Sequence, residues 1–306
     1  MSKNTLRIKK NLNGWLIIDK PLHIGSTPVV SKLKWSLSPC KIGHAGTLDP
    51  LATGVLPIAL GQATKLIPFV MDGKKIYEFQ VTFGCETTTD DAAGEVINNS
   101  QNRPTEEQIK NILPHFIGTI LQIPPIYSAL KINGERAYDL ARNGQDLQLS
   151  PRPVQIDTLE LLKFTGDTAD FRVSCGKGTY VRSLGRDIGR MLGCFGHITV
   201  LRRLKCGPFQ ISDTTPLSVF ETKQDTIKLL PMNTALNNFP TLILSEAEEK
   251  RLKQGQRIPV RQLSTQPTIT DLQDVFCLKY QDKIIGLGKC IHNIIQPYRI
   301  FNDTDT

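Results

Sequence analysis

A strictly alternating stretch at residues 76–83 most constrains the fold of this chain. Tyr77, Phe79, Val81 and Phe83 carry large apolar or aromatic side chains, and the residues between them are polar. Side chains along a strand point alternately to its two faces, so this pattern predicts a half-buried strand. Residues 171–175 alternate in the same way. We therefore expect at least two strands that each bury one face.

Helices are expected close to these strands in the sequence. The apolar strand 15–18 is followed by Thr27-Pro28, which is typical of an N-cap and a first helical residue. A second helix is expected after Gly178, and its arginines recur every fourth residue on one side: Arg182, Arg186 and Arg190. Such a stripe is ordinarily a solvated face. The second basic cluster, at 202–205, favours the alternative that the arginine stripe binds a ligand.

The length of 306 residues fits one large domain and a smaller one. Residues 231–240 have the polarity of a linker. Beyond them, Ser245 and Glu248 form a capping-box pattern, and two apolar strands follow at 275–280 and 284–287. The sequence thus predicts a small β-rich module over residues 241–306, preceded by a domain over residues 1–240.

The net charge of +8 is concentrated in two segments. Residues 1–50 hold eight Lys or Arg against two Asp, and residues 172–210 hold eight against Asp187 alone. Clustered cations favour polyanion binding, because each one near a phosphate releases condensed counterions. Composition alone therefore favours a nucleic acid as partner, although solvated basic faces would give the same count.

Several classes of protein lack their usual signals in this chain. No apolar run reaches the ~18 residues needed to span a bilayer, and the first residues do not resemble a secretory signal, so we expect a cytoplasmic location and no membrane contact. Seven scattered cysteines without a CxxC pair indicate neither disulfides nor a metal site. Phosphate-loop, dinucleotide, zincin and serine-hydrolase motifs are missing, so any activity is expected to need no cofactor.

Asp49 is the carboxylate that most resembles a reactive group. It precedes Pro50, which favours an extended conformation, and it lies in the glycine-rich segment GHAGTLDPLATG. Small neighbours would leave room for a bulky substrate. An Asp-Pro pair among glycines is also typical of a simple turn, so the local sequence leaves both interpretations open.

Longer motifs resemble one family. GWLIIDKP, KIGHAGTLDPLATGVLPIALGQATK, IPPIYSALKINGERAYDLARNG, KGTYVRSLGRDIG and HITVLRR occur in the order found in the bacterial tRNA pseudouridine synthase B (TruB) family, and the likeness covers residues 14–210 strongly. It implies an α+β pseudouridine synthase fold, with a central mixed, mainly antiparallel sheet flanked by helices. It also implies an RNA-binding thumb at about 124–153 and a PUA-like C-terminal RNA-binding domain over residues 241–306.

The resemblance implies conversion of uridine-55 in the TΨC loop of tRNA to pseudouridine. Asp49 would be the nucleophile, attacking either C1′ of the sugar or C6 of the base, and Arg182 would keep it ionised. Tyr77 would stack on the flipped base and relay a proton. Tyr180 and Leu201 would line the uracil pocket.

Three further expectations follow from the same resemblance. His44 would fill the space left by the flipped nucleotide. Lys20 would belong to the substrate-binding residues and would support the loop of Asp49. The implied partner is tRNA: the enzyme would bind its T-arm, and the C-terminal domain would contact its acceptor end. We expect the enzyme to be a monomer. One position departs from the family pattern T-D-T-x-D-x-x-G: Thr88 replaces an Asp, and we expect Asp90 to compensate.

Two other functions fit part of the sequence. A tRNA-binding folding chaperone would use the same basic surface without chemistry, and the joint presence of Asp49, Tyr77 and Arg182 argues against it because binding alone needs no carboxylate. A glycoside hydrolase would need a second acid, and none stands out beside Asp49.

Overall fold

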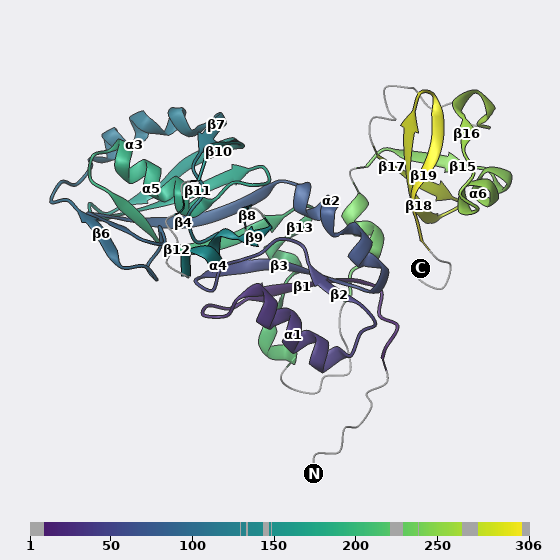
Figure 1. Cartoon of the computed structure of the whole chain (residues 1–306), viewed down its shortest axis with the longest axis horizontal. Helices are drawn as coiled ribbons and strands as arrows, with labels where there is room; N and C mark the ends of the chain where they lie inside the picture. The colour runs from purple at the N-terminus through teal and green to yellow at the C-terminus, as the bar shows by residue number, and fades with distance from the viewer. Residues whose placement is uncertain are drawn as a thin grey trace, which may run out of the picture.

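The computed structural model describes residues 9–128, 130–132, 134–142, 147, 149–220, 229–237, 239–264 and 275–301. Within these ranges a long sheet of ten strands and a separate sheet of five strands form the framework. Figure 1 shows the second sheet, β15–β19, gathered with α6 into a body at one end of the molecule. Each helix in the described ranges falls short of the length and apolar character that a membrane crossing requires.

The long sheet has the order β14-β1-β3-β12-β4-β11-β10-β7, with β13 beside β12 and β2 beside β3. Among the described strand pairs of this long sheet, only β1–β14 and β3–β12 are parallel, so the prediction of a central mixed, mainly antiparallel sheet is confirmed. The strands are β1 (Gly14–Lys20), β2 (Ile42–His44), β3 (Ala52–Leu60), β4 (Lys75–Phe83), β7 (Gly118–Gln122), β10 (Arg152–Phe164), β11 (Thr168–Cys175), β12 (Gly196–Cys206), β13 (Phe209–Gln210) and β14 (Thr215–Pro216).

Helices cover this sheet at both ends. The helices are α1 (Ser26–Leu37), α2 (Ile67–Asp72), α3 (Glu106–Ile112), α4 (Ala137–Arg142) and α5 (Val181–Met191). Short 3-10 helices are Gly61–Leu66, Leu113–Phe116, Ile211–Asp213, Leu217–Phe220 and Met232–Leu236. α3 and α5 pack with β4, β10 and β11 around one core, and α1 packs with β1 and β3 around another (Figure 1).

The alternating strand of residues 76–83 is β4. Phe79, Val81 and Phe83 are buried in the core under α5, as the alternation predicts. Tyr77, at the beginning of the same row, is only partly buried and packs against both cores. It therefore stands at the edge of the apolar interior.

Helix α1 begins earlier than the sequence suggests. Its N-cap is Gly25, so the prediction that Thr27 caps the helix is wrong. Ser26, the first helical residue, is buried and uses its hydroxyl group in a contact with Leu48. The capping boxes of α3 at Thr105 and of α6 at Ser245 are both formed.

The C-terminal sheet has the order β15-β17-β18-β19-β16 and its own apolar core. Its elements are β15 (Thr241–Leu244), α6 (Glu246–Lys253), β16 (Ile258–Pro259), the 3-10 helix Val260–Gln262, β17 (Phe276–Tyr280), β18 (Lys283–Ile291) and β19 (Ile294–Ile300). The β-rich character expected for this part of the chain is confirmed.

Residues 231–240 are not the loose linker that their polarity suggests. Ala235 and Leu236 are buried in a core shared with Trp15 and Phe209 of the long sheet and Phe301 of the C-terminal part. The Trp15 indole also donates a hydrogen bond to the carbonyl of Met232 (3.1 Å). The connection is therefore packed between the two sheets.

The insertion at 124–153 is described in part. It contains helix α4 and two short strands that pair with each other, β8 (Lys131–Ile132) and β9 (Glu135–Arg136). Residues 129, 133, 143–146 and 148, and the side chains of residues 131, 132, 136, 139, 141 and 142, lie outside the described residues. A separate two-stranded sheet pairs β5 (Cys85–Thr87) with β6 (Val96–Asn99). The loop of residues 88–95 connects these two strands.

Leu184 lies on the buried face of α5, so shortening its side chain is expected to destabilise the fold strongly. Leu184→Ala removes a fully buried side chain of the core and is expected to lower the free energy of unfolding by about 2–5 kcal/mol. Leu121→Ala, at a position that is 73% exposed, is the matched control and is expected to change it by less than about 0.5 kcal/mol. Urea denaturation measures both, and equal losses for the two variants would contradict the core assignment.

Candidate active site

The glycine-rich segment 43–54 runs from β2 into β3, and the loop between them, residues 45–51, is held from several sides. The amide of Ala45 donates to the carbonyl of Pro57 (2.8 Å), and the amide of His23 donates to the carbonyl of Pro50 (2.8 Å). The Ser26 hydroxyl accepts from the amide of Leu48 and donates to its carbonyl, at 2.8 and 3.0 Å. Asp49 therefore sits on a loop whose backbone is fixed on both sides of it.

Two buried cations support this loop through its carbonyl groups. The Lys20 ammonium group donates to the carbonyls of Pro21 (2.9 Å), Ile24 (2.6 Å) and Pro50 (3.4 Å). The Arg203 guanidinium donates to Gly46 (3.0 Å), Val55 (2.7 Å) and, at the longest distance, Thr47 (3.4 Å). Burial lowers the pKa of Lys20 to about 8; Asp49 opposes this shift and Arg203 adds to it.

Gly54 is required by the close approach of β12. Its φ is +98°, and a Cβ at this position would lie 2.2 Å from the carbonyl oxygen of Arg203. Only glycine fits such a contact. Gly54 thus lets the backbone of Arg203 lie directly against β3.

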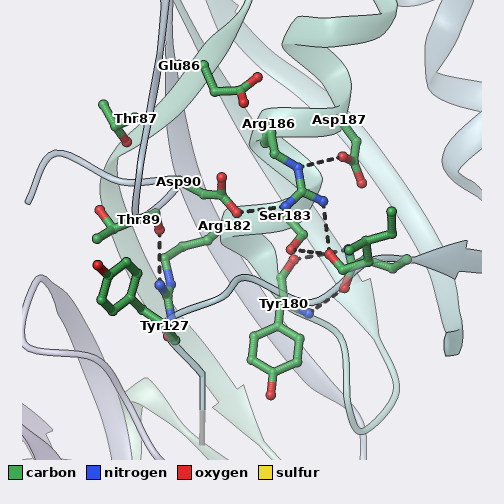
Figure 2. A network of polar contacts seen from close by, with 12 residues as sticks. Glu86, Thr87, Thr89, Asp90, Tyr127, Tyr180, Arg182, Ser183, Arg186 and Asp187 are labelled. Carbon is green, nitrogen blue, oxygen red and sulfur yellow. Dashed lines mark hydrogen bonds and ion pairs between the residues drawn. The ribbon is translucent and has the colours of Figure 1, made fainter. Parts of the chain in front are cut away.

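Asp49 forms an ion pair with Arg182 at the beginning of α5. Arg182 Nε lies 2.9 Å from Asp49 Oδ2; the Arg182 side chain is 7% exposed and that of Asp49 is 40% exposed. The other two nitrogens of the guanidinium donate to the carbonyls of Thr89 (3.0 Å) and Tyr127 (2.9 Å), as Figure 2 shows. The cation is anchored in the protein, while the carboxylate remains accessible.

A cavity of about 570 Å³ opens in front of this pair. Of the residues singled out in the sequence, Asp49, Tyr77, Tyr180, Arg182 and Leu201 line it. The volume lies within the range of small-ligand sites, about 300–1,000 Å³. Residues from β3, β4, β12 and the beginning of α5 therefore converge on a single hollow.

Tyr77 and Tyr180 present phenol groups at this cavity. Burial raises the pKa of Tyr77 to about 12, although the charge of Arg203 and a hydrogen bond from it act in the opposite direction. Burial also raises the pKa of Tyr180. Gln122, which is buried, holds the backbone of Tyr180 by accepting from its amide (2.8 Å) and donating to its carbonyl (3.1 Å). Both phenols are therefore neutral at physiological pH.

Two predicted residues lie outside this group. His44 is on β2 and is not among the residues that line the cavity; burial and Arg203 lower its pKa, which favours a neutral ring. Lys20 is fully buried and bound to carbonyl groups. This position fits support of the Asp49 loop and does not fit direct contact with a substrate.

The basic segment 172–210 is not the exposed cationic surface that its charge suggests. Six of its eight basic residues pair with carboxylates, and the seventh, Arg203, is buried against backbone carbonyls. Arg182 and Arg186 are also buried, so the stripe on α5 is not a solvated face. Arg182, Arg186 and Arg203 are therefore not part of an exposed surface for a polyanion, although their charges count toward the cluster seen in the sequence.

Thr88 and Asp90, at the turn that departs from the family pattern, make separate contacts. The Thr88 hydroxyl itself accepts a hydrogen bond from the amide of Glu95 (3.1 Å) and closes the turn. The Asp90 carboxylate instead contacts Arg186 (2.9 Å). The neighbouring Asp91 Oδ2 lies 3.9 Å from Arg182 Nε, so this loop adds a second carboxylate beside the Asp49–Arg182 pair.

Sequence reasoning missed Arg203, Asp91 and Arg186 as parts of the site. Arg203 has the same strand parity as Leu201, which was a usable signal that it faces inward. Asp91 and Arg186 gave no comparable signal, because their partners lie far apart in the sequence. In the described ranges, no three His, Cys, Asp or Glu side chains gather in a way that could hold a metal ion.

Comparisons with known proteins identify the family of this chain. Residues 34–181 match the TruB family pseudouridylate synthase N-terminal domain, and residues 182–237 match the tRNA pseudouridylate synthase B C-terminal domain. A tRNA pseudouridine synthase B of Rhizobium etli is 51% identical over 98% of this chain and 100% of its own length. The corresponding protein of Agrobacterium fabrum is 46% identical over 95% of each chain.

A solved structure shows the same fold. A chain in the crystal structure of a Cbf5-Nop10-Gar1 complex superimposes with a TM-score of 0.71 at 27% identity, over 91% of this chain and 78% of that one. The two family matches and the near full-length relatives leave no ambiguity about kinship. This chain belongs to the TruB family of tRNA pseudouridine synthases, and it is an isomerase that modifies tRNA.

Proposed function

We propose that this enzyme isomerises uridine-55 in the TΨC loop of tRNA to pseudouridine, with Asp49 as the covalent catalyst. The observation that supports this most directly is the accessible Asp49 carboxylate, 2.9 Å from a buried arginine at the mouth of a cavity. A carboxylate must be ionised to act as a nucleophile, and a fixed cation both pairs with it and orients it. Arg182 supplies that cation.

The reaction breaks the N1–C1′ bond of the uridine, turns the uracil and joins C5 to C1′. A carboxylate is suited to this sequence because it can form a covalent bond and later leave. Asp49 attacks C1′ of the sugar or C6 of the base. C5 then loses its proton, and N1, freed from C1′, gains one, so the reaction is balanced. The phenol oxygen of Tyr77, at the wall of the cavity, is the proposed relay: it accepts the proton from C5 while the hydroxyl passes its own proton on toward N1.

The cavity requires the target base to leave its stack. Enzymes that act on a base extrude it into a pocket and read it by stacking and hydrogen bonds. In the proposed complex Tyr77 stacks on the flipped uracil, while Tyr180 and Leu201 enclose it. His44, with its neutral ring, fills the place that the nucleotide leaves in the loop, since stacking needs no charge.

The remaining parts of the chain are proposed to hold the tRNA. The insertion at 124–153 is the thumb that closes over the T-arm, and the β-rich residues 241–306 form a PUA-like domain that contacts the acceptor end. Lys65 donates to the carbonyl of Ile300 (3.2 Å) and so links the two parts of the protein. We propose a monomer that acts in the cytoplasm, where tRNA is its substrate.

Asp49→Asn is expected to abolish turnover and to leave tRNA binding intact. The amide keeps the shape of the side chain but cannot act as the nucleophile. Tritium release from tRNA that carries [5-³H]uridine measures turnover, and a filter-binding assay measures the affinity. Full turnover by Asp49→Asn would refute the assignment of the nucleophile.

The activity is expected to fall as the pH rises through about 8, where Lys20 loses its charge. The ammonium group has three protons for three carbonyls, and a neutral amine has two, so the contact to Pro50 beside Asp49 is lost. A pH profile of the single-turnover rate measures this. Lys20→Met, the neutral control, is expected to be slower and to lack the alkaline decline; a wild-type rate that stays constant from pH 7 to pH 9.5 would contradict the role of Lys20.

A further inference from the structure

Two arginines on α5, one turn apart, each bridge the same two segments of the chain. Arg182 donates to the carbonyl of Thr89 in the loop that follows β5 and to the carbonyl of Tyr127 at the entrance of the insertion. Arg186 contacts Asp90 in that loop and donates to the carbonyl of Ile123 at that entrance. Figure 2 shows these contacts beside one another.

The contacts of Arg186 are direct and shielded from water. Its Nη1 lies 2.9 Å from Asp90 Oδ2, and both side chains are 8% exposed. The Arg186 Nη2 donates to the carbonyl of Ile123 (2.9 Å), and the Arg186 Nε donates to the carboxylate of Asp187 (2.9 Å). The carbonyl of Ile123 also accepts from the hydroxyl of Ser183 (2.8 Å). All three guanidinium nitrogens are therefore engaged, and none of these contacts reaches Asp49.

Asp90 holds an unusual backbone conformation. Its φ is +61°, in the left-handed region that non-glycine residues seldom adopt. Its amide donates to the carbonyl of Thr87 (3.2 Å), and its carbonyl accepts from the amide of Ile198 on β12 (3.0 Å). The ion pair with Arg186 thus fixes a strained residue directly between Thr89 and Asp91, both of which face Arg182.

We propose that Asp90 and Arg186 are positioning residues that hold the loop 89–91 and the entrance 123–127 in register, and thereby fix Arg182 against Asp49. This inference rests on the proposed function, because it assigns the pair a role in the chemistry of Asp49. It implies that the entrance of the insertion is tied to α5 through the carbonyls of Ile123 and Tyr127. The Asp49–Arg182 geometry is then set by the protein itself, before RNA binds.

A third arginine of α5 provides a matched control. Arg190, one turn beyond Arg186, pairs with the buried Glu86 (2.6 Å) through two guanidinium nitrogens, and so binds a residue outside both segments 89–91 and 123–127. Arg190→Gln leaves Glu86 without that partner and is expected to lower the melting temperature. A purely structural role for Arg186 would give the same result for both substitutions.

The test compares Arg186→Gln, Arg186→Lys, Asp90→Asn and Arg190→Gln in the full chain. Single-turnover tritium release at saturating enzyme measures the rate, and filter binding measures the tRNA Kd. Loss of positioning near reacting groups costs up to about 10²-fold in rate, so Arg186→Gln is expected to lose that order of activity with little change in Kd. Arg186→Lys and Asp90→Asn are expected to fall between it and the wild type, because each keeps part of the contact.

Hydrogen exchange provides a readout that does not depend on activity. Peptides covering residues 118–128 are expected to exchange faster in Arg186→Gln than in the wild type and at the wild-type rate in Arg190→Gln. Full single-turnover activity in Arg186→Gln, an equal loss of rate in Arg190→Gln, or unchanged exchange in Arg186→Gln would each overturn the proposal. A wild-type enzyme without activity on tRNA would refute the proposed function instead, and the exchange data would still decide whether Arg186 holds residues 123–127.

Discussion

The ion pair between Asp49 and Arg182 is the interaction on which the rest of the site depends. A carboxylate at the mouth of a partly apolar cavity loses hydration, and a fixed cation offsets that loss. Arg182 is fixed because two backbone carbonyls take its other nitrogens. The carboxylate is fixed because Ser26, Lys20 and Arg203 hold the loop around it. Two rigid supports, one from α5 and one from beneath the loop, thus meet at a single contact.

The long sheet brings these supports together. β3 follows the Asp49 loop, and its parallel partner β12 carries Leu201 and Arg203. β4, on the other side of β12, brings Tyr77 opposite Arg203. The cavity therefore forms where three adjacent strands and the first turn of α5 converge. No one of these elements contains the site by itself.

Much of this arrangement could be predicted from the sequence. The alternation in β4 predicts its buried row, and the glycine-rich loop with Asp49 indicates a shaped segment because close backbone approach requires glycine. The choice of partners could not be predicted. Arg182, Arg186 and Arg190 form a regular stripe that resembles a solvated face, and only the fold shows Asp49, Asp90 and Glu86 opposite them. Net charge per segment is likewise a poor guide to charge at the surface, since Arg203 is fully buried. The polarity of residues 231–240 misled for the same reason, because the packing of Ala235 and Leu236 depends on the distant residues Trp15 and Phe301.

In the proposed reaction, a flipped uridine enters the cavity and contacts the Asp49 carboxylate. The most direct measurement is a crystal structure of the enzyme with a T-arm stem-loop that carries 5-fluorouridine at the target position. We predict the modified nucleotide outside the RNA stack, within the cavity bounded by Tyr77, Tyr180 and Leu201, and in contact with or bonded to the Asp49 carboxylate. Such a structure would also distinguish attack at C1′ from attack at C6. A target nucleotide that remains stacked in the RNA loop, or that binds away from Asp49, would contradict the account.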